Sequence, residues 1–509
     1  MEHSEPLDLF VVGGGINGAG IACDAAGRNL KVGLCEMQDF AGATSSASSK
    51  LIHGGLRYLE HYEFRLVREA LSEREVLLHK APHLSWPLHF VLPHEPHLRP
   101  RWMLRLGLFL YDHLDWRMTL PKSKTVRLRT SPYGEGLADR YETGFVYSDA
   151  WVDDARLVIA NLRSAHKMGA SIWARHRCVS ARRDDGLWRI ELEATSSGQR
   201  TRLAARGLVN AAGPWVGSFL QDVTALPTAK RVRLIKGSHI VVPRLHKGRH
   251  AFILQNKDNR IIFVLPYERD FSLIGTTDIP FDGDPRSVHI EESEKSYLCD
   301  IANAYLAHQV TPQQVVWTYS GVRPLFDDGS DDPSAVTRDY VLEIADHDGV
   351  LPLLSVFGGK ITTYRRLAEH ALDDLAKYFP RAGPAWTAGA PLIDGELADA
   401  ATPALAFQYF LEGLQRAYPG LPADYLHALA HRHGTGCEAI LGEARSTAEL
   451  GRHFGGHLYE REVEHLMREE WASAAEDVLW RRTKEGLHMG PQGALALAAW
   501  MAGHRSNIA

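Results

Sequence analysis

The segment Leu7–Glu36, LDLFVVGGGINGAGIACDAAGRNLKVGLCE, decides the fold. Its first six residues form a mostly apolar run that predicts a strand, and three glycines follow at once. Residues Ile16–Ala26 then predict a helix that ends at Gly27, and Leu30–Cys35 predict a second strand that closes with Glu36. A strand, a tight turn, a helix and a second strand form the βαβ unit of a doubly wound parallel sheet.

The turn in this unit has the chemistry of a nucleotide site. Gly13, Gly15 and Gly18 have the spacing G-x-G-x-x-G. Because glycine has no side chain, backbone N–H groups at the positive end of the helix can approach a pyrophosphate. Glu36 can accept hydrogen bonds from ribose hydroxyls, whereas its charge would repel a 2′-phosphate. The segment therefore predicts FAD or NAD rather than NADP.

Length, composition and charge exclude several classes of protein. The chain has 509 residues, of which 45% are hydrophobic and 23% charged. This length predicts two to four globular domains, and the formal charge of −5 disfavours a dedicated nucleic-acid-binding protein. The start, MEHSEPLDLFVVGGG, lacks a leader pattern, and no uncharged apolar stretch of about 18 residues occurs. We therefore expect neither secretion nor a membrane span.

The cysteine and histidine patterns indicate no metal and no disulfide framework. The five cysteines are scattered and form no CxxC, which favours a reducing cytosol. The sequence contains no HExxH, and His431 and His433 are expected at an exposed helix end. We expect no metal.

The remaining patterns predict a second sheet and a helical C-terminal part. Residues Glu63–His79 are helical in pattern. An antiparallel sheet is predicted by four strand-like runs, Arg233–Val242, Ala251–Gln255, Arg260–Tyr267 and Phe271–Gly275. A Gly-, Pro- and Ala-rich stretch, Arg381–Gly395, indicates a domain boundary. Beyond it the strand signals vanish, and a capping box at Ser473 and Glu476 predicts a helix over Asp477–Thr483.

A hydroxyl-rich run followed by glycines occupies residues 43–58, ATSSASSKLIHGGLRY. Its short side chains suit hydrogen bonds to phosphate and ribityl groups, and its bulky second half is unlike a flexible serine linker. Together with five later motifs, this run resembles the FAD-dependent glycerol-3-phosphate dehydrogenases of the respiratory chain, within the larger group of flavoprotein amine and hydroxyl oxidases. The motifs are LVNAAGPWV (208–216), RLIKGSHIVV (233–242), GTTD (275–278), YSGVRPL (319–325) and LSVFGGKITTYRRL (354–367).

The resemblance spans about residues 7–480 and implies an α/β fold. This fold has a Rossmann-like FAD-binding domain, an interleaved antiparallel-sheet substrate domain like that of amino-acid oxidases, and a C-terminal all-helical domain. We expect the oxidoreductase region over residues 1–388 and the helical domain over 389–509. The FAD-binding segments are expected at about 1–75, 150–230 and 345–388, and the substrate-domain segments at about 76–149 and 231–344.

The resemblance also implies the cofactor contacts. Lys360 follows two glycines and precedes a helical stretch, where its charge and the helix end would stabilise negative charge on a reduced flavin; alternatively it is an exposed capping lysine. The expected FAD-binding residues are Gly13, Gly15, Asn17, Gly18, Glu36, Thr44, Ser45, Ser46, Leu51, Gly54, Gly213, Gly358, Gly359 and Thr362.

A substrate phosphate and a secondary alcohol need cations and a base. Planar guanidinium groups can grip a phosphate in a bidentate manner, and we expect Arg57 and Arg323 in that role. His53 is the expected base for the hydroxyl proton, and His53, Arg323 and Lys360 form the catalytic set. Further contacts are expected from Tyr58, which can instead be a packing residue, and from Thr276 and Asp278, which can instead hold a turn.

The sequence HLRPRWMLRLGLFLYDH, His97–His113, mixes three arginines with aromatic and aliphatic residues. This mixture is typical of a membrane-surface helix, although a core helix with extended arginines has the same pattern. Membrane contact suits an enzyme that passes electrons to ubiquinone or a similar quinone. We therefore expect a peripheral protein at the cytoplasmic face of the inner membrane, with a homodimer as an open alternative.

The resemblance leads to one function and leaves two alternatives. The expected reaction is oxidation of sn-glycerol 3-phosphate to dihydroxyacetone phosphate, by hydride transfer to FAD. The nearest alternative is an oxidase of the same lineage that uses oxygen and makes peroxide. The third is a membrane-docked interaction module in which the flavin is only structural.

Overall fold

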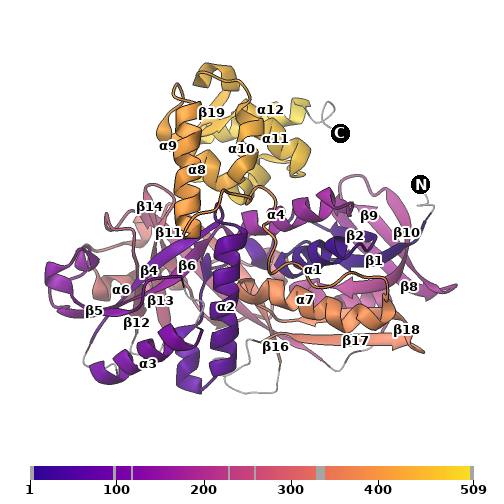
Figure 1. The fold of residues 1–509 in the computed structure, drawn as a ribbon, viewed down its shortest axis with the longest axis horizontal. Helices are drawn as coiled ribbons and strands as arrows, with labels where there is room; N and C mark the ends of the chain where they lie inside the picture. The colour runs from indigo at the N-terminus through magenta and orange to yellow at the C-terminus, as the bar shows by residue number, and fades with distance from the viewer. Residues whose placement is uncertain are drawn as a thin grey trace.

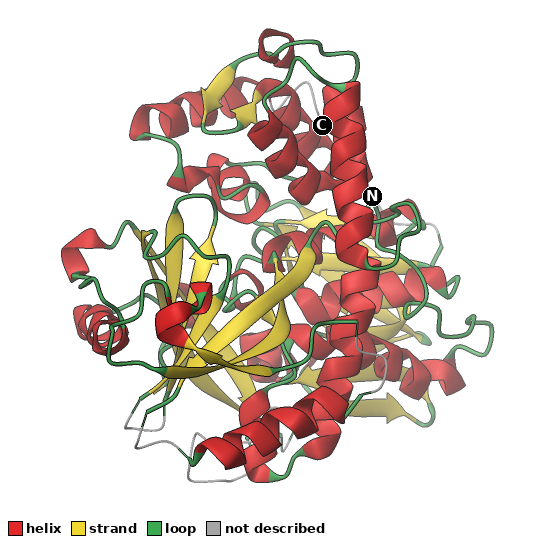
Figure 2. Ribbon diagram, turned by 60° about the vertical axis from the view of Figure 1, so that its left-hand side comes forward, coloured by secondary structure: helices red, strands yellow, loops and turns green. Residues whose placement is uncertain are grey.

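The computed structural model describes residues 5–95, 99–115, 119–226, 228, 230–256, 260–327 and 339–504, without the side chains of Arg57, Glu60 and His61. Two large sheets stand next to each other, and the helices of the C-terminal part lie above them (Figure 1). Figure 2 shows the strands of both sheets with helices packed against them, and the helical C-terminal part at the top. The described cysteines are all buried and free.

The first sheet has the parallel core that the opening segment predicts. Its order is β17-β18-β10-β1-β2-β7, with a hairpin of β8 and β9 joined to β10, and β1 pairs in parallel with both neighbours. Helix α1 packs against α4 and α7. The strands are β1 (Leu7–Val12), β2 (Val32–Glu36), β7 (Ser171–Ala174), β8 (His176–Asp184), β9 (Leu187–Ala194), β10 (Arg200–Asn210), β17 (Val341–His347) and β18 (Val350–Phe357), and the helices α1 (Ile16–Gly27), α4 (Asp154–Lys167), α5 (Val216–Ser218) and α7 (Tyr364–Leu375).

The predicted βαβ unit is confirmed with one shifted boundary. The strand β1 and the start of α1 are as predicted, but β2 begins at Val32 rather than Leu30. The amide of Leu30 donates to the carbonyl of Ala25 over 3.1 Å, so it closes the end of α1. A helix end needs such a donor for its free carbonyls, which takes Leu30 out of the strand.

The second sheet contains the four predicted antiparallel strands as neighbours, in the order β11-β14-β13-β12. It is a mixed sheet, because β12 pairs in parallel with β4. Its strands are β3 (Leu51–Ile52), β4 (Ser85–Pro93), β5 (Lys124–Arg127), β6 (Thr143–Val152), β11 (Val232–Pro243), β12 (Ala251–Gln255), β13 (Ile261–Tyr267), β14 (Phe271–Gly275), β15 (Ile279–Pro280) and β16 (Trp317–Phe326), and the helices near it are α2 (Phe64–Lys80), α3 (Arg101–His113) and α6 (Glu292–Tyr305).

The C-terminal domain is predominantly helical, as predicted, and also contains one short strand pair. Two hydrophobic clusters form its interior. The pair β19 and β20 is so short that it leaves no strand pattern in the sequence. The elements are α8 (Pro403–Ala417), α9 (Ala423–His433), α10 (Cys437–Leu441), β19 (His453–Gly455), β20 (Leu458–Tyr459), α11 (Glu460–Glu469), a π-helical turn (Asp477–Arg482) and α12 (Pro491–His504).

Two local predictions in this domain are wrong. His433 ends helix α9 as expected but is fully buried, and its Nε2 lies 2.8 Å from a carboxylate oxygen of Glu462. Asp477, not Glu476, accepts the amide of Ser473, over 2.8 Å. In both cases the helix end is visible in the sequence, but the choice of partner depends on tertiary packing. Within the described ranges, every helix is too short or too polar to span a lipid bilayer.

Candidate active site

A cavity of about 870 Å³ extends along the edge of the first sheet and reaches the second. Its size is near the upper end of ligand sites, as a dinucleotide would require. Most of the residues expected from the sequence line it, although they come from distant parts of the chain. They are Gly13, Gly15, Asn17, Glu36, Thr44, Ser45, Leu51, His53, Tyr58, Gly213, Thr276, Arg323, Gly358, Gly359, Lys360 and Thr362.

Four other expected residues lie just outside the lining. A Cβ on Gly18 would be 1.9 Å from the carbonyl oxygen of Gly13, so Gly18 permits the close approach of α1 to the turn. Ser46 lines a smaller neighbouring cavity, and the amide of Gly54 donates to the Tyr111 hydroxyl over 2.9 Å. Asp278 forms an ion pair with Arg323. The side chain of Arg57, the remaining expected residue, lies outside the described structure.

At the β1–α1 end, Glu36 connects the second strand to the glycine turn. Its two carboxylate oxygens accept the amides of Gly14 and Gln38, each over 2.8 Å. Burial raises the pKa of Glu36, and these amides oppose the rise because they stabilise the charged form. The hydroxyl of Ser45 accepts the amide of Ile16 over 2.9 Å, which fixes the serine run against the start of α1.

The backbone at this end fits a dinucleotide. Gly13 has φ +113°, and a Cβ on it would be 2.4 Å from the carbonyl oxygen of Ala211. Asn17 donates to the carbonyl of Gly358 over 3.1 Å, while its buried Oδ1 has no hydrogen-bond partner in the described structure. A cradle without side chains and a free buried acceptor are what a phosphate- and flavin-containing ligand would use.

The turn that Asn17 contacts carries a cation, Lys360, into the cavity lining. Gly358 and Gly359 have φ +81° and +100°, which turns the chain sharply from β18 towards α7. Lys360 follows them, and its Nζ is 4.1 Å from the centre of the Tyr58 ring. Two residues further on, the hydroxyl of Thr362 accepts the amide of His53 over 3.4 Å. Lys360, Tyr58 and His53 are thus held around one end of the cavity.

Arg323 enters from the strand pair β11–β16. Its Nη2 donates to the carbonyl of Thr277 over 3.0 Å and to Asp278 over 3.1 Å. A Cβ on Gly237 would lie 2.9 Å from this Nη2 and 2.6 Å from the Thr276 hydroxyl, so only glycine leaves room for both. These contacts orient the guanidinium group at the cavity.

Two further histidines, His176 and His239, line the cavity and were missed by sequence reasoning, and His239 is the buried one of the two. Its Nε2 lies 2.9 Å from the hydroxyl of Ser49, and its ring stacks on Tyr319 with 4.7 Å between centroids. Burial, with the nearby charges of Lys50 and Arg323, lowers its pKa well below the ordinary value, so the imidazole is neutral. Its position follows from the register of β11 with β16, in which His239 faces Tyr319.

A buried ion pair supports the serine run from behind. Lys50 is 1% exposed, and its Nζ lies 2.8 Å from both carboxylate oxygens of Asp154 at the start of α4. The same carboxylate accepts the Ser48 hydroxyl over 2.7 Å, and Lys50 also donates to the carbonyl of Ser46 over 3.0 Å. Burial lowers the pKa of Lys50 and Asp154 opposes the change.

The fold and this cavity define an FAD-dependent oxidoreductase. The family of FAD dependent oxidoreductases matches residues 8–365, and the family described as the C-terminal domain of alpha-glycerophosphate oxidase matches residues 385–502. A solved glycerol-3-phosphate dehydrogenase from Bacillus halodurans, complexed with FAD, has a TM-score of 0.76 and 28% identity, and the match covers 99% of this chain and 91% of that one. FAD is the cofactor.

Curated relatives narrow the class. The aerobic glycerol-3-phosphate dehydrogenase of Escherichia coli strain K12 is 52% identical over 98% of this chain and 97% of its own length. The D-erythritol 1-phosphate dehydrogenase of Brucella abortus strain 2308 is 50% identical over 98% of each chain. The chain belongs to the family of FAD-dependent glycerol-3-phosphate dehydrogenases, which confirms the resemblance found in the sequence.

The glycine geometry generates a prediction. Gly18→Ala should purify with less than about a tenth of the wild-type flavin, because the new methyl group would overlap the carbonyl oxygen of Gly13 at 1.9 Å. The measurement is the ratio of flavin to protein absorbance after purification. Gly217→Ala is the control, because a Cβ there has no atom within 4 Å, and it should retain its flavin. A full flavin complement in Gly18→Ala would contradict this account of the turn.

Proposed function

We propose that the protein oxidises sn-glycerol 3-phosphate to dihydroxyacetone phosphate and passes the electrons to a membrane quinone. The observation that carries the proposal is the meeting of His53, Arg323 and Lys360 in the cavity that holds the FAD-binding turn. Two cations and a base are the groups that a phosphorylated secondary alcohol requires. Relatives of similar length carry the name of this activity.

In this proposal the phosphate dianion binds to Arg323. The guanidinium group is already oriented by Asp278 and by the carbonyl of Thr277, so little side-chain freedom is lost on binding. Tyr58 and Thr276 line the same cavity. The Tyr58 hydroxyl can donate to a phosphate oxygen, and the Thr276 hydroxyl can do so if it gives up its 3.1 Å bond to the carbonyl of Thr277. From the family resemblance, Arg57 is proposed as the second guanidinium group.

FAD, when bound, supplies the acceptor for the hydride from the substrate carbon. His53 takes the hydroxyl proton, because a neutral imidazole is a base of suited strength near neutral pH. Neutral His239 lines the same cavity, but its strongly lowered pKa makes it a poor proton acceptor, so it suits a hydrogen-bonding role. Lys360 lies at the start of the segment that leads into α7. There its positive charge would stabilise the negative charge of a reduced flavin.

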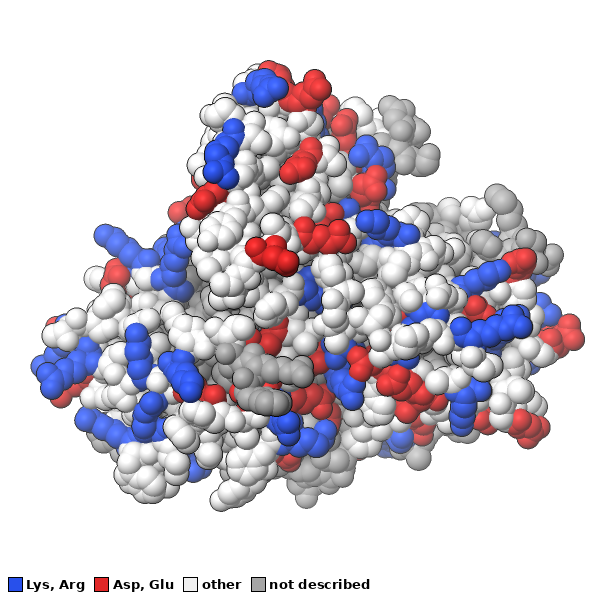
Figure 3. Space-filling view, viewed as in Figure 1, with Lys and Arg blue, Asp and Glu red and all other residues white. Residues whose placement is uncertain are grey.

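The proposed electron acceptor requires contact with a membrane. The helix α3 packs against the short helix Leu56–His61, which contains the cavity residue Tyr58. These two elements and the start of α2 expose an apolar patch, which consists of Tyr62, Phe64, Trp102, Leu106, Phe109 and Leu110. Figure 3 shows Lys and Arg side chains among uncharged surface over the region of α3. Such a surface suits the lipid boundary, close to the flavin end of the cavity.

The structure refines the expected set of arginines. Arg101 is exposed, whereas Arg105 donates to the Ser123 hydroxyl over 2.7 Å and is half-buried. His97, the first residue of the expected segment, lies outside the described residues. We therefore assign the membrane contact to the apolar patch, with Arg99 and Arg101 as its cationic border, at the cytoplasmic face of the inner membrane.

The proposed reaction predicts that the substrate reduces the flavin in the absence of oxygen. The flavin absorbance should bleach with sn-glycerol 3-phosphate, and glycerol and the opposite enantiomer should leave it unchanged. D-erythritol 1-phosphate is included because a relative of almost equal identity carries that name. Faster bleaching with this longer phosphate would reassign the substrate, and a flavin that no polyol phosphate bleaches would favour a structural flavin.

Reoxidation in the same experiment tests the acceptor. A ubiquinone analogue should restore the flavin spectrum much faster than oxygen does. Peroxide formation in step with substrate consumption, at a rate equal to that with the quinone, would instead identify an oxidase.

The phosphate contact predicts a large effect for Arg323→Ala. Loss of a charged hydrogen bond costs about 1.5 to 3 kcal/mol, so kcat/KM should fall about 10- to 150-fold. The control is Arg286→Ala, which removes an exposed arginine that also lines the cavity but pairs with Asp284. The kcat/KM of this control should stay within about twofold of the wild-type value. If the kcat/KM of Arg323→Ala stays within about twofold of the wild-type value, Arg323 does not bind the substrate phosphate.

The apolar patch predicts vesicle binding. Wild-type protein should co-sediment with anionic phospholipid vesicles, and Trp102→Ser/Leu106→Ser/Phe109→Ser should lose most of this binding, because burial of three large apolar side chains drives it. The control Tyr409→Ser/Leu495→Ser removes exposed apolar residues from the C-terminal domain and should bind as wild type. Unchanged binding of the triple variant would refute the patch as the docking surface.

A further inference from the structure

The loop of residues 37–42 follows Glu36 and closes one side of the FAD cavity. Gln38, Ala41 and Gly42 belong to the lining. The loop lies directly on the glycine turn: the amide of Ala41 donates to the carbonyl of Gly14 over 3.1 Å. The ring of Phe40 packs so closely on Gly14 that a Cβ there would be 2.5 Å from it. Because of these contacts, a displacement of the loop would also displace the glycine turn.

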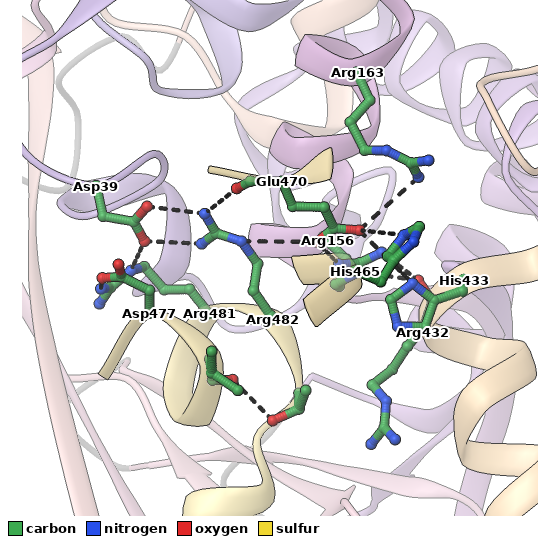
Figure 4. Close-up of polar contacts among 12 residues, drawn as sticks. Asp39, Arg156, Arg163, Arg432, His433, His465, Glu470, Asp477, Arg481 and Arg482 are labelled. Atoms are coloured by element: carbon green, nitrogen blue, oxygen red, sulfur yellow. Dashed lines mark hydrogen bonds and ion pairs between the residues drawn. The ribbon is translucent and has the colours of Figure 1, made fainter. Parts of the chain in front are cut away.

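The outer side of this loop contacts residues far away in the sequence. The carboxylate of Asp39 is 3% exposed and accepts Nη1 and Nη2 of Arg482 over 2.8 and 2.9 Å, and Arg481 donates to the same carboxylate (Figure 4). The ring of Phe40 meets Trp471 edge to face, with 5.4 Å between centroids. Both arginines and Trp471 belong to the C-terminal domain.

A second link crosses from the first sheet. The amide of Arg175 donates to the carbonyl of Gln38 over 3.1 Å, and its guanidinium group pairs with Asp477 over 2.8 Å. Asp477 also pairs with Arg481. The loop is therefore enclosed by a continuous set of charges from the π-helical turn Asp477–Arg482.

The network continues beneath Arg482 to α4. Arg482 donates to the carbonyl of Glu470 over 2.8 Å, and the Glu470 carboxylate pairs with Arg156. His433 and His465 lie beside Glu470, an arrangement that could ligate a metal ion. However, Nη2 of Arg156 is 3.4 Å from Nδ1 of His433, so a guanidinium group already faces these ligand atoms. The cluster in Figure 4 thus acts as an ionic link between the domains.

We propose that the C-terminal domain completes the FAD site, with Arg482 and Arg481 as positioning residues that hold Asp39, and through it the 37–42 loop, in the conformation that receives the adenosine half of FAD. The contacts with Gly14 transmit this position to the phosphate-binding turn. A buried carboxylate without its cationic partners is unstable unless it becomes hydrated or protonated. Hydration would require the loop that carries Asp39 to move away from the glycine turn. FAD affinity then depends on residues that do not touch the cofactor.

The test is the dissociation constant of FAD, measured by fluorescence titration of apo-protein. Asp39→Asn keeps the side-chain volume and removes the charge, and should weaken FAD binding at least tenfold, which is about 1.4 kcal/mol. The matched control is Asp394→Asn, which removes a carboxylate paired with Arg163 of α4 across the same domain junction. Asp394 is outside the cavity lining and has φ +65°, which asparagine tolerates. It should change the FAD dissociation constant by less than twofold.

Two further variants separate positioning from general loosening. Asp39→Asn/Arg482→Gln replaces the ion pair by a neutral hydrogen-bonding pair and should bind FAD better than Asp39→Asn alone. Arg481→Gln, at a partly exposed side chain, serves if Asp39→Asn does not fold, and should weaken FAD binding at least threefold.

The proposal fails if Asp39→Asn binds FAD within twofold of wild type, or if Asp394→Asn weakens binding as much as Asp39→Asn does. It also fails if Arg481→Gln leaves the affinity unchanged. The melting temperatures of the apo-proteins show whether Asp39→Asn and Asp394→Asn lower the stability of the protein by equal amounts. Because the titration needs no substrate, its result is independent of the proposed reaction.

Discussion

The whole arrangement depends on the missing side chains at the turn between β1 and α1. Gly13 and Gly18 bring α1 so close to the central strand that a single methyl group would not fit between them. This contact places α1 between α4 and α7 and leaves backbone N–H groups facing the cavity. The second sheet then supplies the opposite wall through Gly237 and Gly321, which face each other in the β11–β16 register. Close backbone approach is thus used on two walls of the same cavity.

Buried ion pairs fix two cavity-lining segments that have no strand partners in the described structure. Lys50 with Asp154 fixes the serine run, and Arg482 with Asp39 fixes the loop after β2. Such pairs add little net stability, because desolvation offsets their attraction. Their value is geometric, since each pair has one low-energy arrangement and joins segments that are distant in the chain. A flavoprotein that must bind a long, flexible cofactor gains a preformed site in this way.

Local sequence was sufficient for the elements with a strong period or turn. Strands β1, β12 and β14 and the start of α1 were predicted to the residue, and the segments and motifs quoted from the sequence together contain most of the cavity lining. The rest depends on long-range pairing. His239 reaches the cavity through the register of two strands far apart in sequence, and His433 is buried by a carboxylate on another helix. No local pattern encodes such partners. The roles of the individual site residues stay predictions.

The interleaving of the two sheets has a consequence for biosynthesis. The first sheet takes strands from the beginning, the middle and residues 341–357 of the chain, and the carboxylate of Asp39, in the loop beside its glycine turn, pairs with Arg481 and Arg482 near the end of the chain. A ribosome delivers the chain from its N-terminus, and contacts of high sequence separation form late. The nascent protein therefore cannot complete the cavity lining before residues 341–362 have emerged, and the proposed support of the 37–42 loop comes later still. Translation products that end before β18 would have β1 and the glycine turn, but not the Gly358–Thr362 part of the cavity.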